Sequence, residues 1–275
     1  MIKNIVTFVL SFFLVVGLYF GLLLYDKQES LLFKNVPLEQ DYVFETPYPA
    51  QEIYLDTADG GKIHALLFQK KTIPSKSLVL YFHGRGGNLS TKGNYVAGLF
   101  LDKNYDVLMM DYRGFGKSYG PLSEKKLLSD TDLIYNYAAA KYDPSEIIIY
   151  GRSLGTGFAA FTASKHKARL LILEAPYYSM LDLASEKFSF LPKSFFKILL
   201  KYHLKTSEWI LNSQMPVQIF HGTHDKLIPI ENSKKLRALQ KDKIHLTILK
   251  EATHDDLSSH QLYLKTMDQL LKKTP

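Results

Sequence analysis

The feature of the sequence that most constrains the fold is an apolar segment, expected to form a buried strand, that leads directly into a turn with a glycine at each end. Residues 147–150 read Ile-Ile-Ile-Tyr, residues 151–155 read Gly-Arg-Ser-Leu-Gly, and residues 156–160 continue as Thr-Gly-Phe-Ala-Ala. An apolar strand that turns sharply into a small-residue helix is typical of a parallel sheet covered by helices. The two glycines permit the turn, which would hold the serine hydroxyl at the carboxyl end of the strand. Ser153 is therefore the candidate nucleophile.

Apolar runs alternate with helical patterns along most of the chain, which predicts an α/β fold with a mostly parallel sheet and helices on both faces. Residues 175–214 interrupt the alternation and are rich in Phe, Leu and Lys, so we interpret them as a short helical lid inserted in a domain spanning 51–275. The expected strands are Glu52–Asp56, Lys62–Gln69, Leu78–Phe82, Asp106–Met110, Glu146–Tyr150, Leu170–Glu174, Val217–His221 and His245–Leu249. The expected helices lie near Tyr95–Asp102, Glu124–Lys141, Thr156–Lys165, Glu231–Leu239 and Ser259–Lys272.

The same G-x-S-x-G pattern occurs a second time, at residues 116–120. That copy lies several residues beyond the nearest expected strand, and it runs into Pro121 rather than opening a helix. The pattern marks a nucleophile only in a strand-turn-helix context. We therefore interpret Ser118 as an ordinary loop serine.

Two further glycine patterns resemble nucleotide-binding motifs. Residues 155–160 fit G-x-G-x-x-A, and Glu174 ends the next expected strand, as in a dinucleotide-binding fingerprint. Those glycines begin well inside the turn rather than at the end of the strand, so helix packing explains them better. Residues 116–118 resemble the end of a phosphate-binding loop, but Asp111 stands where that loop needs glycine.

A serine nucleophile needs a base, and the base needs an orienting carboxylate. In a sheet of this kind the chain order is serine, then acid, then histidine. Of the nine histidines, only His254 and His260 lie beyond the last expected strand. His260 is expected on the final helix, whereas His254 lies in a loop from which it could reach the strand ends. His254 is therefore the candidate base.

The candidate acid is Asp225, in the loop that follows the expected strand at 217–221. A lone aspartate in such a loop often only forms a turn. Asp255 and Asp256 are the alternatives, but they adjoin His254 in the chain and would meet its ring with difficulty.

The segment from His83 to Asn88 is a glycine-rich turn that follows an expected buried strand. Its exposed backbone N–H groups could stabilise an oxyanion together with the N–H of Leu154. We choose the backbone of Arg85 as the second donor, and we expect His83 to shape the turn.

Composition excludes several kinds of chemistry. The chain contains no cysteine, so disulfides, zinc–thiolate sites and a cysteine nucleophile are ruled out. His221 and His224 lack suitably spaced partners for a metal and are interpreted as structural, so no metal or cofactor is expected. The formal charge is +7, but no nucleic-acid-binding motif accompanies it.

Residues 5–25 contain no charged side chain. A helix of this length reaches roughly 30 Å, enough to cross a bilayer. The run is longer than a usual signal-peptide core, and no small-x-small site follows because Ala50 is the first alanine. We therefore expect an uncleaved single-pass transmembrane anchor at 1–25 and a connector at 26–50. Lys3 gives a slight bias towards a cytoplasmic N-terminus, with the catalytic domain on the outer or periplasmic side.

Within the expected lid, residues 192–205 predict one further helix that begins with Pro192. Four lysines spaced four apart would form a basic stripe beside an apolar, aromatic face; they are Lys193, Lys197, Lys201 and Lys205. Such a helix either lies against a membrane surface or covers the site with its apolar face. Both interpretations stay open at the level of sequence.

Taken together, these motifs resemble the α/β-hydrolase superfamily from about residue 50 to the end, and more closely its single-span, membrane-anchored branch of serine hydrolases. The resemblance is carried by residues 83–88, 111–118, 151–155, 221–225 and 254–257. It implies an eight-stranded sheet, hydrolysis of an ester, thioester or amide, and no cofactor. It also implies that the second G-x-S-x-G belongs to a structural loop.

The leading hypothesis is a serine hydrolase that cleaves a carboxylic ester or thioester through a Ser-His-Asp triad and an acyl-enzyme. Its partners would be a small-molecule or lipid-like acyl substrate and the membrane, with no nucleic acid. The alternatives are a serine peptidase or amidase, because the same triad cleaves amides, and a catalytically inactive hydrolase-like binding protein, because a fold alone does not give a function.

Overall fold

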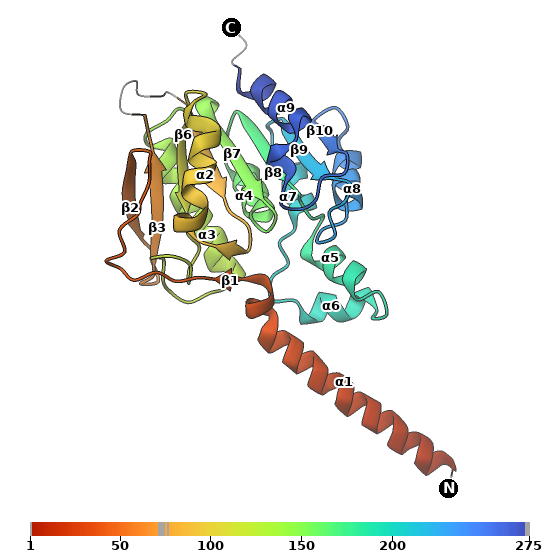
Figure 1. The fold of residues 1–275 in the computed structure, drawn as a ribbon. Coiled ribbons are helices and arrows are strands. Elements are labelled where there is room, and N and C mark those ends of the chain that lie inside the picture. The colour runs from red at the N-terminus through yellow and green to blue at the C-terminus, as the bar shows by residue number, and fades with distance from the viewer. Residues whose placement is uncertain (1, 71–74, 76, 273–275) are drawn as a thin grey trace.

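The computed structural model describes residues 2–70, 75 and 77–272. Within them, eight strands form the central sheet in the order β10-β9-β8-β7-β4-β6-β3-β2 (Figure 1). A separate two-stranded pairing joins β1 (Lys34–Asn35) to β5 (Gly86–Gly87). The sheet strands are β2 (Ala50–Asp56), β3 (Lys62–Phe68), β4 (Leu78–Phe82), β6 (Asp106–Met110), β7 (Ile147–Arg152), β8 (Leu170–Glu174), β9 (Val217–Gly222) and β10 (Ile244–Leu249).

All neighbouring strands from β6 to β10 across the sheet are parallel, whereas β3 runs antiparallel to both β2 and β6. Every residue of β4, β6 and β8 is buried. Strands covered on both faces are apolar along most of their length, which explains why these segments lack the alternation of a half-exposed strand. Their two charged residues, Asp106 and Glu174, have hydrogen-bond partners in Tyr142 and Arg152. The predicted α/β fold with a mostly parallel sheet is confirmed.

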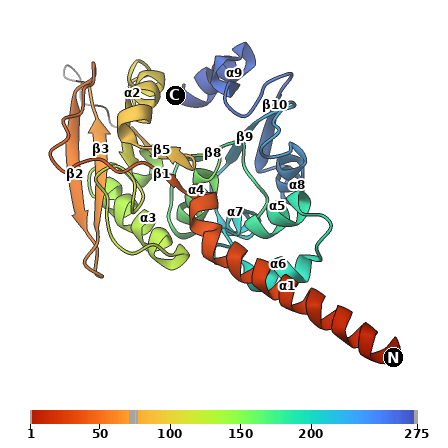
Figure 2. The same ribbon diagram turned by 60° about the horizontal axis from the view of Figure 1, so that its bottom comes forward.

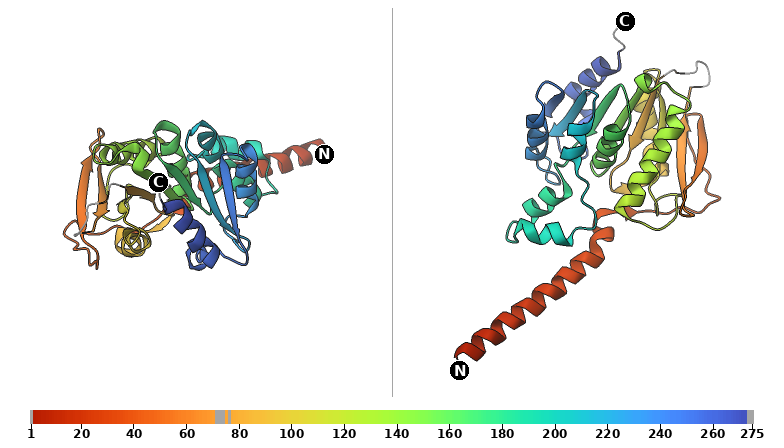
Figure 3. Two further views of the ribbon diagram at one scale, coloured as in Figure 1. Left: turned by 90° about the horizontal axis from the view of Figure 1, so that it is seen from above. Right: turned by 180° about the vertical axis from the view of Figure 1, so that it is seen from behind.

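Helices cover the sheet on both faces, as the view along its edge shows (Figure 3). One face packs against α3 (Glu124–Ala139), α4 (Gly155–Lys165), α7 (Thr206–Asn212) and α8 (Glu231–Leu239), and the other packs against α2 (Leu89–Leu101) and α9 (Gln261–Leu271). Two short 3-10 turns, Pro144–Glu146 and Leu257–Ser259, complete the connections. Because the strands from β6 to β10 are parallel, their carboxyl ends lie along one edge of the sheet. Loops that follow these ends can bring side chains from different parts of the chain close together.

Helix α2 begins earlier than the expected start near Tyr95. Asn88 caps it, because its side chain accepts a hydrogen bond from the Ser90 N–H while the Thr91 hydroxyl accepts one from the Asn88 N–H. This reciprocal arrangement satisfies N–H groups that the first turn of a helix leaves unpaired. Capping chemistry, rather than apolar periodicity, therefore sets this boundary.

The N-terminal helix α1 (Ile2–Leu32) projects away from the sheet and continues past Tyr25, where the sequence pattern places the end of the anchor (Figure 1). Across the described part of the chain, no helix combines the length and the apolar character that crossing a membrane requires. The predicted single-pass transmembrane anchor is therefore not supported.

The inserted segment at 175–214 contains α5 (Met180–Lys187), α6 (Lys193–Leu199) and α7. The single helix predicted from Pro192 to Lys205 is wrong, because α6 ends at Leu199 and Leu200 is extended. A side chain of α1 explains this end: the amide of Gln28 donates to the Leu199 carbonyl at 2.8 Å and accepts from the Lys201 N–H at 2.8 Å. Helix α1 runs beside α6 in Figure 2.

The predicted stripe of four lysines is consequently not formed. Lys201 and Lys205 lie beyond the end of α6. Lys201 stands over the ring of Tyr25, with 4.4 Å between the ammonium nitrogen and the ring centroid, and Lys205 pairs with Glu208. The Lys201 contact depends on how α1 lies against the segment, so the sequence pattern alone could not reveal it. The Lys205–Glu208 pair is a local contact at the start of α7.

Candidate active site

Ser153 lies at the turn between β7 and α4, in a backbone conformation that few residues adopt. Its φ is 53°, in the left-handed region that costs free energy for a residue other than glycine. A Cβ at Gly155 would lie 2.1 Å from the Phe82 carbonyl oxygen, and one at Gly151 would lie 2.4 Å from the Gly155 carbonyl oxygen. Both glycines are therefore required by close backbone approaches, and they hold the Ser153 side chain at the end of the strand.

Three side chains from distant loops meet at this turn. The Nε2 of His254 lies 3.0 Å from the Ser153 hydroxyl oxygen. The Nδ1 of the same ring lies 2.7 Å from Oδ2 of Asp225. All three side chains are almost completely buried. The structure thus brings together the predicted nucleophile, base and acid in one hydrogen-bonded chain.

The Asp225 carboxylate is held in place by its own loop. Its Oδ1 accepts hydrogen bonds from the N–H groups of Leu227 and Ile228, both at 2.8 Å. Burial by itself would raise the pKa of the Asp225 carboxyl, but hydrogen bonds from His221, His254 and the Ile228 N–H hold that pKa below its ordinary value. Asp225 is therefore ionised, as a carboxylate that orients an imidazole must be.

His221 belongs to this support. Its ring contacts the Ser233 hydroxyl at 2.6 Å and the Ile228 carbonyl at 2.9 Å, and it lies 3.3 Å from Asp225. The His221 imidazole thus links the loop that carries Asp225 to α8.

The glycine-rich turn after β4 lies directly against Ser153. A Cβ at Gly84 would be 3.5 Å from the Ser153 Cβ. The Arg85 carbonyl accepts a hydrogen bond from the Lys34 N–H at 2.8 Å, which ties the turn to the strand pairing of β1 with β5. Leu154 is the N-cap of α4, where the first N–H groups of a helix have no carbonyl partner. The predicted oxyanion donors thus belong to the residue that follows Ser153 and to a turn that lies against it.

His83 is buried at the base of the same turn. Its Nδ1 lies 2.7 Å from the Gly84 carbonyl oxygen, and its ring packs against Tyr112, whose hydroxyl donates to the His83 carbonyl at 2.7 Å. These contacts fix the path of the backbone beside Ser153.

Arg152 is a site residue that the sequence analysis does not single out. Its guanidinium donates to the His254 carbonyl at 2.8 Å and to the carboxylates of Glu174 and Asp255, both at 2.9 Å. Burial by itself would lower the pKa of Arg152, but Glu174 and Asp255 raise it above the ordinary value. Arg152 therefore joins the turn at Ser153 to the loop that carries His254. The sequence contained one indication of this link: Arg152 adjoins Ser153, and the acidic residue Asp255 adjoins His254.

The second G-x-S-x-G has a different environment. The Ser118 hydroxyl donates to the Asp111 carbonyl at 2.7 Å and accepts from the His64 N–H at 2.8 Å. The serine is buried, and both of its hydrogen bonds are to backbone groups. Ser118 therefore closes a loop onto β3 and β6.

The remaining alternatives have structural partners. Glu174 binds Arg152 and is buried with the hydroxyl groups of Tyr150 and Tyr263. A Cβ at Gly157 would meet the Tyr177 hydroxyl at 2.1 Å, so this glycine serves helix packing. Asp256 accepts from the Thr253 N–H at 2.7 Å and thereby shapes the histidine loop.

Two cavities of opposite character meet at Ser153. One has a volume of about 330 Å³ and is mainly apolar; it is lined by Leu24, Gln28, Leu31, Leu32, Arg85, Ser153, Leu154, Tyr177, Met180, Leu183, Ala184, Lys187, Phe188, Phe196, Leu199, Leu200, Leu227 and Ile228. The other has a volume of about 520 Å³ and contains more polar groups, among them Lys34, Lys92, Arg152, Glu174, His254 and Asp255. An apolar group and a polar group attached to one carbon next to Ser153 therefore each have a cavity of matching character.

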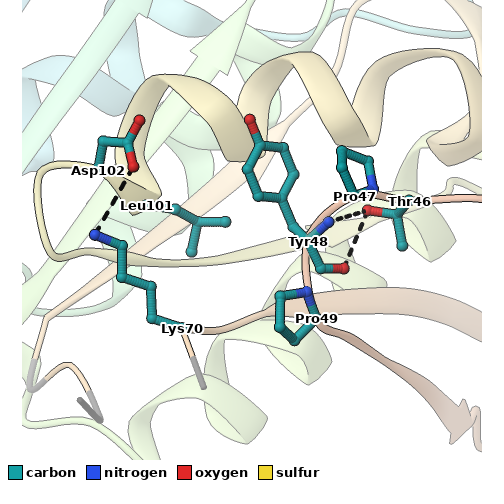
Figure 4. Close-up of a pocket in the computed structure, with 7 residues that line it drawn as sticks. All are labelled: Thr46, Pro47, Tyr48, Pro49, Lys70, Leu101 and Asp102. Atoms are coloured by element: carbon teal, nitrogen blue, oxygen red, sulfur yellow. Dashed lines mark hydrogen bonds and ion pairs between the residues drawn. The ribbon is translucent and has the colours of Figure 1, made fainter. Parts of the chain in front are cut away.

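A further hollow of about 490 Å³ lies away from these residues, between the segment at 46–49 and the end of α2 (Figure 4). An ion pair between Lys70 and Asp102, 3.8 Å apart, borders it. Its lining contains no histidine or serine, and the only carboxylate is Asp102. This hollow therefore lacks the serine and histidine side chains that meet at Ser153.

Comparison with known proteins identifies the family of the chain. A family model described as "Serine aminopeptidase, S33" matches residues 73–210, half of the chain. The chain therefore belongs to this family of α/β hydrolases. It is 28% identical to the "Uncharacterized protein YfhR" of Escherichia coli K12 over 222 residues, which cover 78% of this chain and 76% of that one. It is 26% identical to the "Alpha/beta hydrolase domain-containing protein 17B" of Xenopus tropicalis, with 81% and 75% covered.

Solved structures with the same fold include the esterase Pf2001 of Pyrococcus furiosus. Its TM-score is 0.66 at 17% identity, and the alignment covers 87% of this chain and 97% of the esterase. An α/β hydrolase from Vibrio vulnificus gives a TM-score of 0.65 at 21% identity, with 81% and 80% covered. At these identities the likeness establishes the α/β-hydrolase fold alone.

Proposed function

We propose that this protein is a serine hydrolase that cleaves a carboxylic ester or thioester of an acyl group. The observation that carries the proposal is the hydrogen-bonded chain from Ser153 through His254 to Asp225, with the serine in a strained turn. A hydroxyl within reach of an imidazole, whose other nitrogen contacts a carboxylate, is the arrangement that activates serine as a nucleophile.

In the proposed reaction, His254 removes the proton of the Ser153 hydroxyl as its oxygen attacks the acyl carbon. The tetrahedral oxyanion would accept hydrogen bonds from the N–H groups of Arg85 and Leu154. Collapse of the intermediate expels the alcohol or thiol, which takes its proton from His254, and leaves an acyl-enzyme on Ser153. Water activated by His254 then attacks the acyl-enzyme, which releases the acid and restores the serine.

The apolar cavity supports an acyl group rather than a peptide amine as the bound moiety. An aminopeptidase, the activity in the description of the family, must receive a positively charged amino terminus. The only carboxylates among the lining residues of the two cavities at Ser153 are Glu174 and Asp255, and both pair with Arg152. A peptidase stays the alternative, and we propose the inserted segment at 175–214 as a lid over the acyl group.

The test uses the purified full chain with nitrophenyl esters of graded acyl length, an aminoacyl nitroanilide and a fluorophosphonate label. We expect ester hydrolysis and covalent labelling, and both should disappear in Ser153→Ala. Preference for the nitroanilide would favour the peptidase. A folded protein that neither hydrolyses nor becomes labelled would be the inactive binding protein.

A membrane location through residues 1–25 stays a prediction that the structure does not support. Retention of the full chain in the membrane fraction after carbonate washing would favour it, and release into the supernatant would exclude an integral anchor. If the chain is retained, protease protection of the catalytic domain would test the expected outward orientation.

A further inference from the structure

The apolar cavity beside Ser153 has a wall that comes from the N-terminal helix. Four of its lining residues, Leu24, Gln28, Leu31 and Leu32, belong to the end of α1. The opposite walls come from α5, α6 and the loop at 227–228. Residues 24–32, which we call the α1 wall, therefore stand on the same cavity as the nucleophile although they lie far from it in sequence.

The side-chain amide of Gln28 is hydrogen-bonded at this position. Both polar atoms of its amide are hydrogen-bonded at the end of α6, one to the Leu199 carbonyl and the other to the Lys201 N–H just beyond the helix, and Gln28 is 7% exposed. The amide therefore brings no unpaired polar group to the cavity, where such a group would oppose the entry of an apolar chain. Gln28 thus holds the lid against α1 while its aliphatic part lies beside the apolar lining.

Other contacts fix the α1 wall to the domain. The Tyr202 hydroxyl donates to the Glu29 carboxylate at 3.0 Å. Phe33, which is 3% exposed, packs edge-on against the Tyr202 ring with 5.1 Å between centroids. A buried edge-on aromatic pair of this kind stabilises the contact between the end of α1 and Tyr202.

The α1 wall is also joined to the turn that flanks the nucleophile. The Arg85 guanidinium donates to the Leu31 carbonyl at 3.3 Å, and the Lys34 N–H donates to the Arg85 carbonyl. One continuous segment thus contacts both the lid and the proposed oxyanion turn.

We propose that the α1 wall binds the acyl chain of the substrate and sets the acyl length that the enzyme prefers. The inference rests on the proposed ester or thioester hydrolysis at Ser153. It assigns substrate binding to a helix whose composition suggests only an anchor. Removal of the residues before position 30 would delete Leu24 and Gln28 from the cavity and release the end of α6.

A matched pair of substitutions in the full chain tests the proposal. Leu24 is half-buried and lines the cavity, whereas its neighbour Leu23 is 40% exposed and is not part of the lining. The variants Leu24→Trp and Leu23→Trp make the same change one position apart on the same helix. The assays are kcat/KM on nitrophenyl acetate and nitrophenyl octanoate, together with thermal unfolding.

We expect Leu24→Trp to lower kcat/KM for octanoate by about tenfold or more, since occupying an apolar pocket discriminates to about this extent per lost group. Hydrolysis of acetate, which does not reach the α1 wall, should change less than about twofold. Leu23→Trp should leave both substrates unchanged. Leu24→Ala, which enlarges the cavity without adding bulk, should move the preference towards longer chains and remains informative if the tryptophan variant unfolds.

Equal octanoate-to-acetate ratios in wild type, Leu24→Trp and Leu24→Ala would overturn the proposal, as would an equal loss in the Leu23 and Leu24 tryptophan variants. Failure of the proposed function is recognised separately, because the wild-type protein would then hydrolyse neither ester in a Ser153-dependent way.

Discussion

The two copies of G-x-S-x-G in this chain share a pattern and differ in everything that decides chemistry. At Ser153 the serine hydroxyl meets the His254 ring, at the end of a parallel strand. At Ser118 the hydroxyl meets only backbone groups, the His64 N–H and the Asp111 carbonyl. The glycines of the second copy serve a loop, since Gly116 has a φ of 50° and Gly120 a φ of 124°. A short motif therefore specifies a sharp turn, whereas the role of its serine depends on which groups contact the hydroxyl in the folded protein.

The largest expected effect separates the two serines directly. Ser153→Ala should lower kcat by roughly 10⁴-fold or more, because it removes the nucleophile, and His254→Ala should cost as much because it removes the base. Ser118→Ala should leave kcat within about tenfold of the wild type. Steady-state kinetics on a nitrophenyl ester measures all three, and loss of activity in Ser118→Ala alone would reverse the assignment.

The acid provides the next effect. Asp225→Asn should lower kcat by about 10⁴-fold, because an amide no longer fixes the imidazole in the form that accepts the serine proton. Asp256→Asn is the matched control, since Asp256 binds the Thr253 N–H instead of the imidazole. Equal losses in the two variants would show that Asp225 is not the orienting acid.

Arg152 should give a smaller effect of a different kind. Arg152→Gln leaves Glu174 without its charged partner and frees the His254 loop, so we expect kcat to fall by roughly tenfold to 100-fold with little change in KM. Arg152→Gln should also lower the stability of the fold, because it leaves the Glu174 carboxylate buried without a charged partner. Adding Glu174→Gln should restore part of this stability, because the uncompensated carboxylate is removed. An unchanged kcat would show that the His254 loop needs no support from Arg152.

For Ser118 the measurable cost should be stability. Ser118→Ala leaves the His64 N–H and the Asp111 carbonyl without the hydroxyl, and each unsatisfied buried group costs about 1–3 kcal/mol. Thermal unfolding should therefore show a lower midpoint for Ser118→Ala. Ser153→Ala should change the midpoint less, because it keeps the Cβ in the same backbone conformation and removes only the contact with the His254 ring. A stable Ser118→Ala protein would contradict the structural role of this loop.

The smallest effect is a dependence of stability on pH. The pKa of Asp225 is lower in the folded protein than its ordinary value, so the ionised carboxylate contributes stability that is present in full above about pH 4–5 and is lost as the pH falls below that range. Asp225→Asn lacks this contribution. The difference in unfolding free energy between wild type and Asp225→Asn should therefore shrink from pH 7 towards pH 3, and a constant difference would refute the linkage.

Much of the molecule follows from local sequence. Apolar runs such as Leu78–Phe82 and Leu170–Glu174 match the observed strands to the residue, because a strand buried on both faces is apolar along most of its length. The turn at Ser153 was also predictable, since strand, glycines and small-residue helix are adjacent in the chain. The chain order of Asp225 and His254 then indicated the other two members of the hydrogen-bonded group.

What only the tertiary structure decided lies in contacts between distant segments. Helical periodicity extended one lid helix through Lys205, but Gln28 of α1 pairs with the backbone at Leu199 and Lys201 and ends it. Arg152 became a link to the histidine loop only when β7 and that loop met. The wall that α1 adds to the cavity likewise depends on a helix docking far from its place in the chain. Hydrophobic periodicity indicates which residues are buried, and the spacing of glycines indicates where a sharp turn can form. The partner of a side chain depends on which distant segments fold against each other.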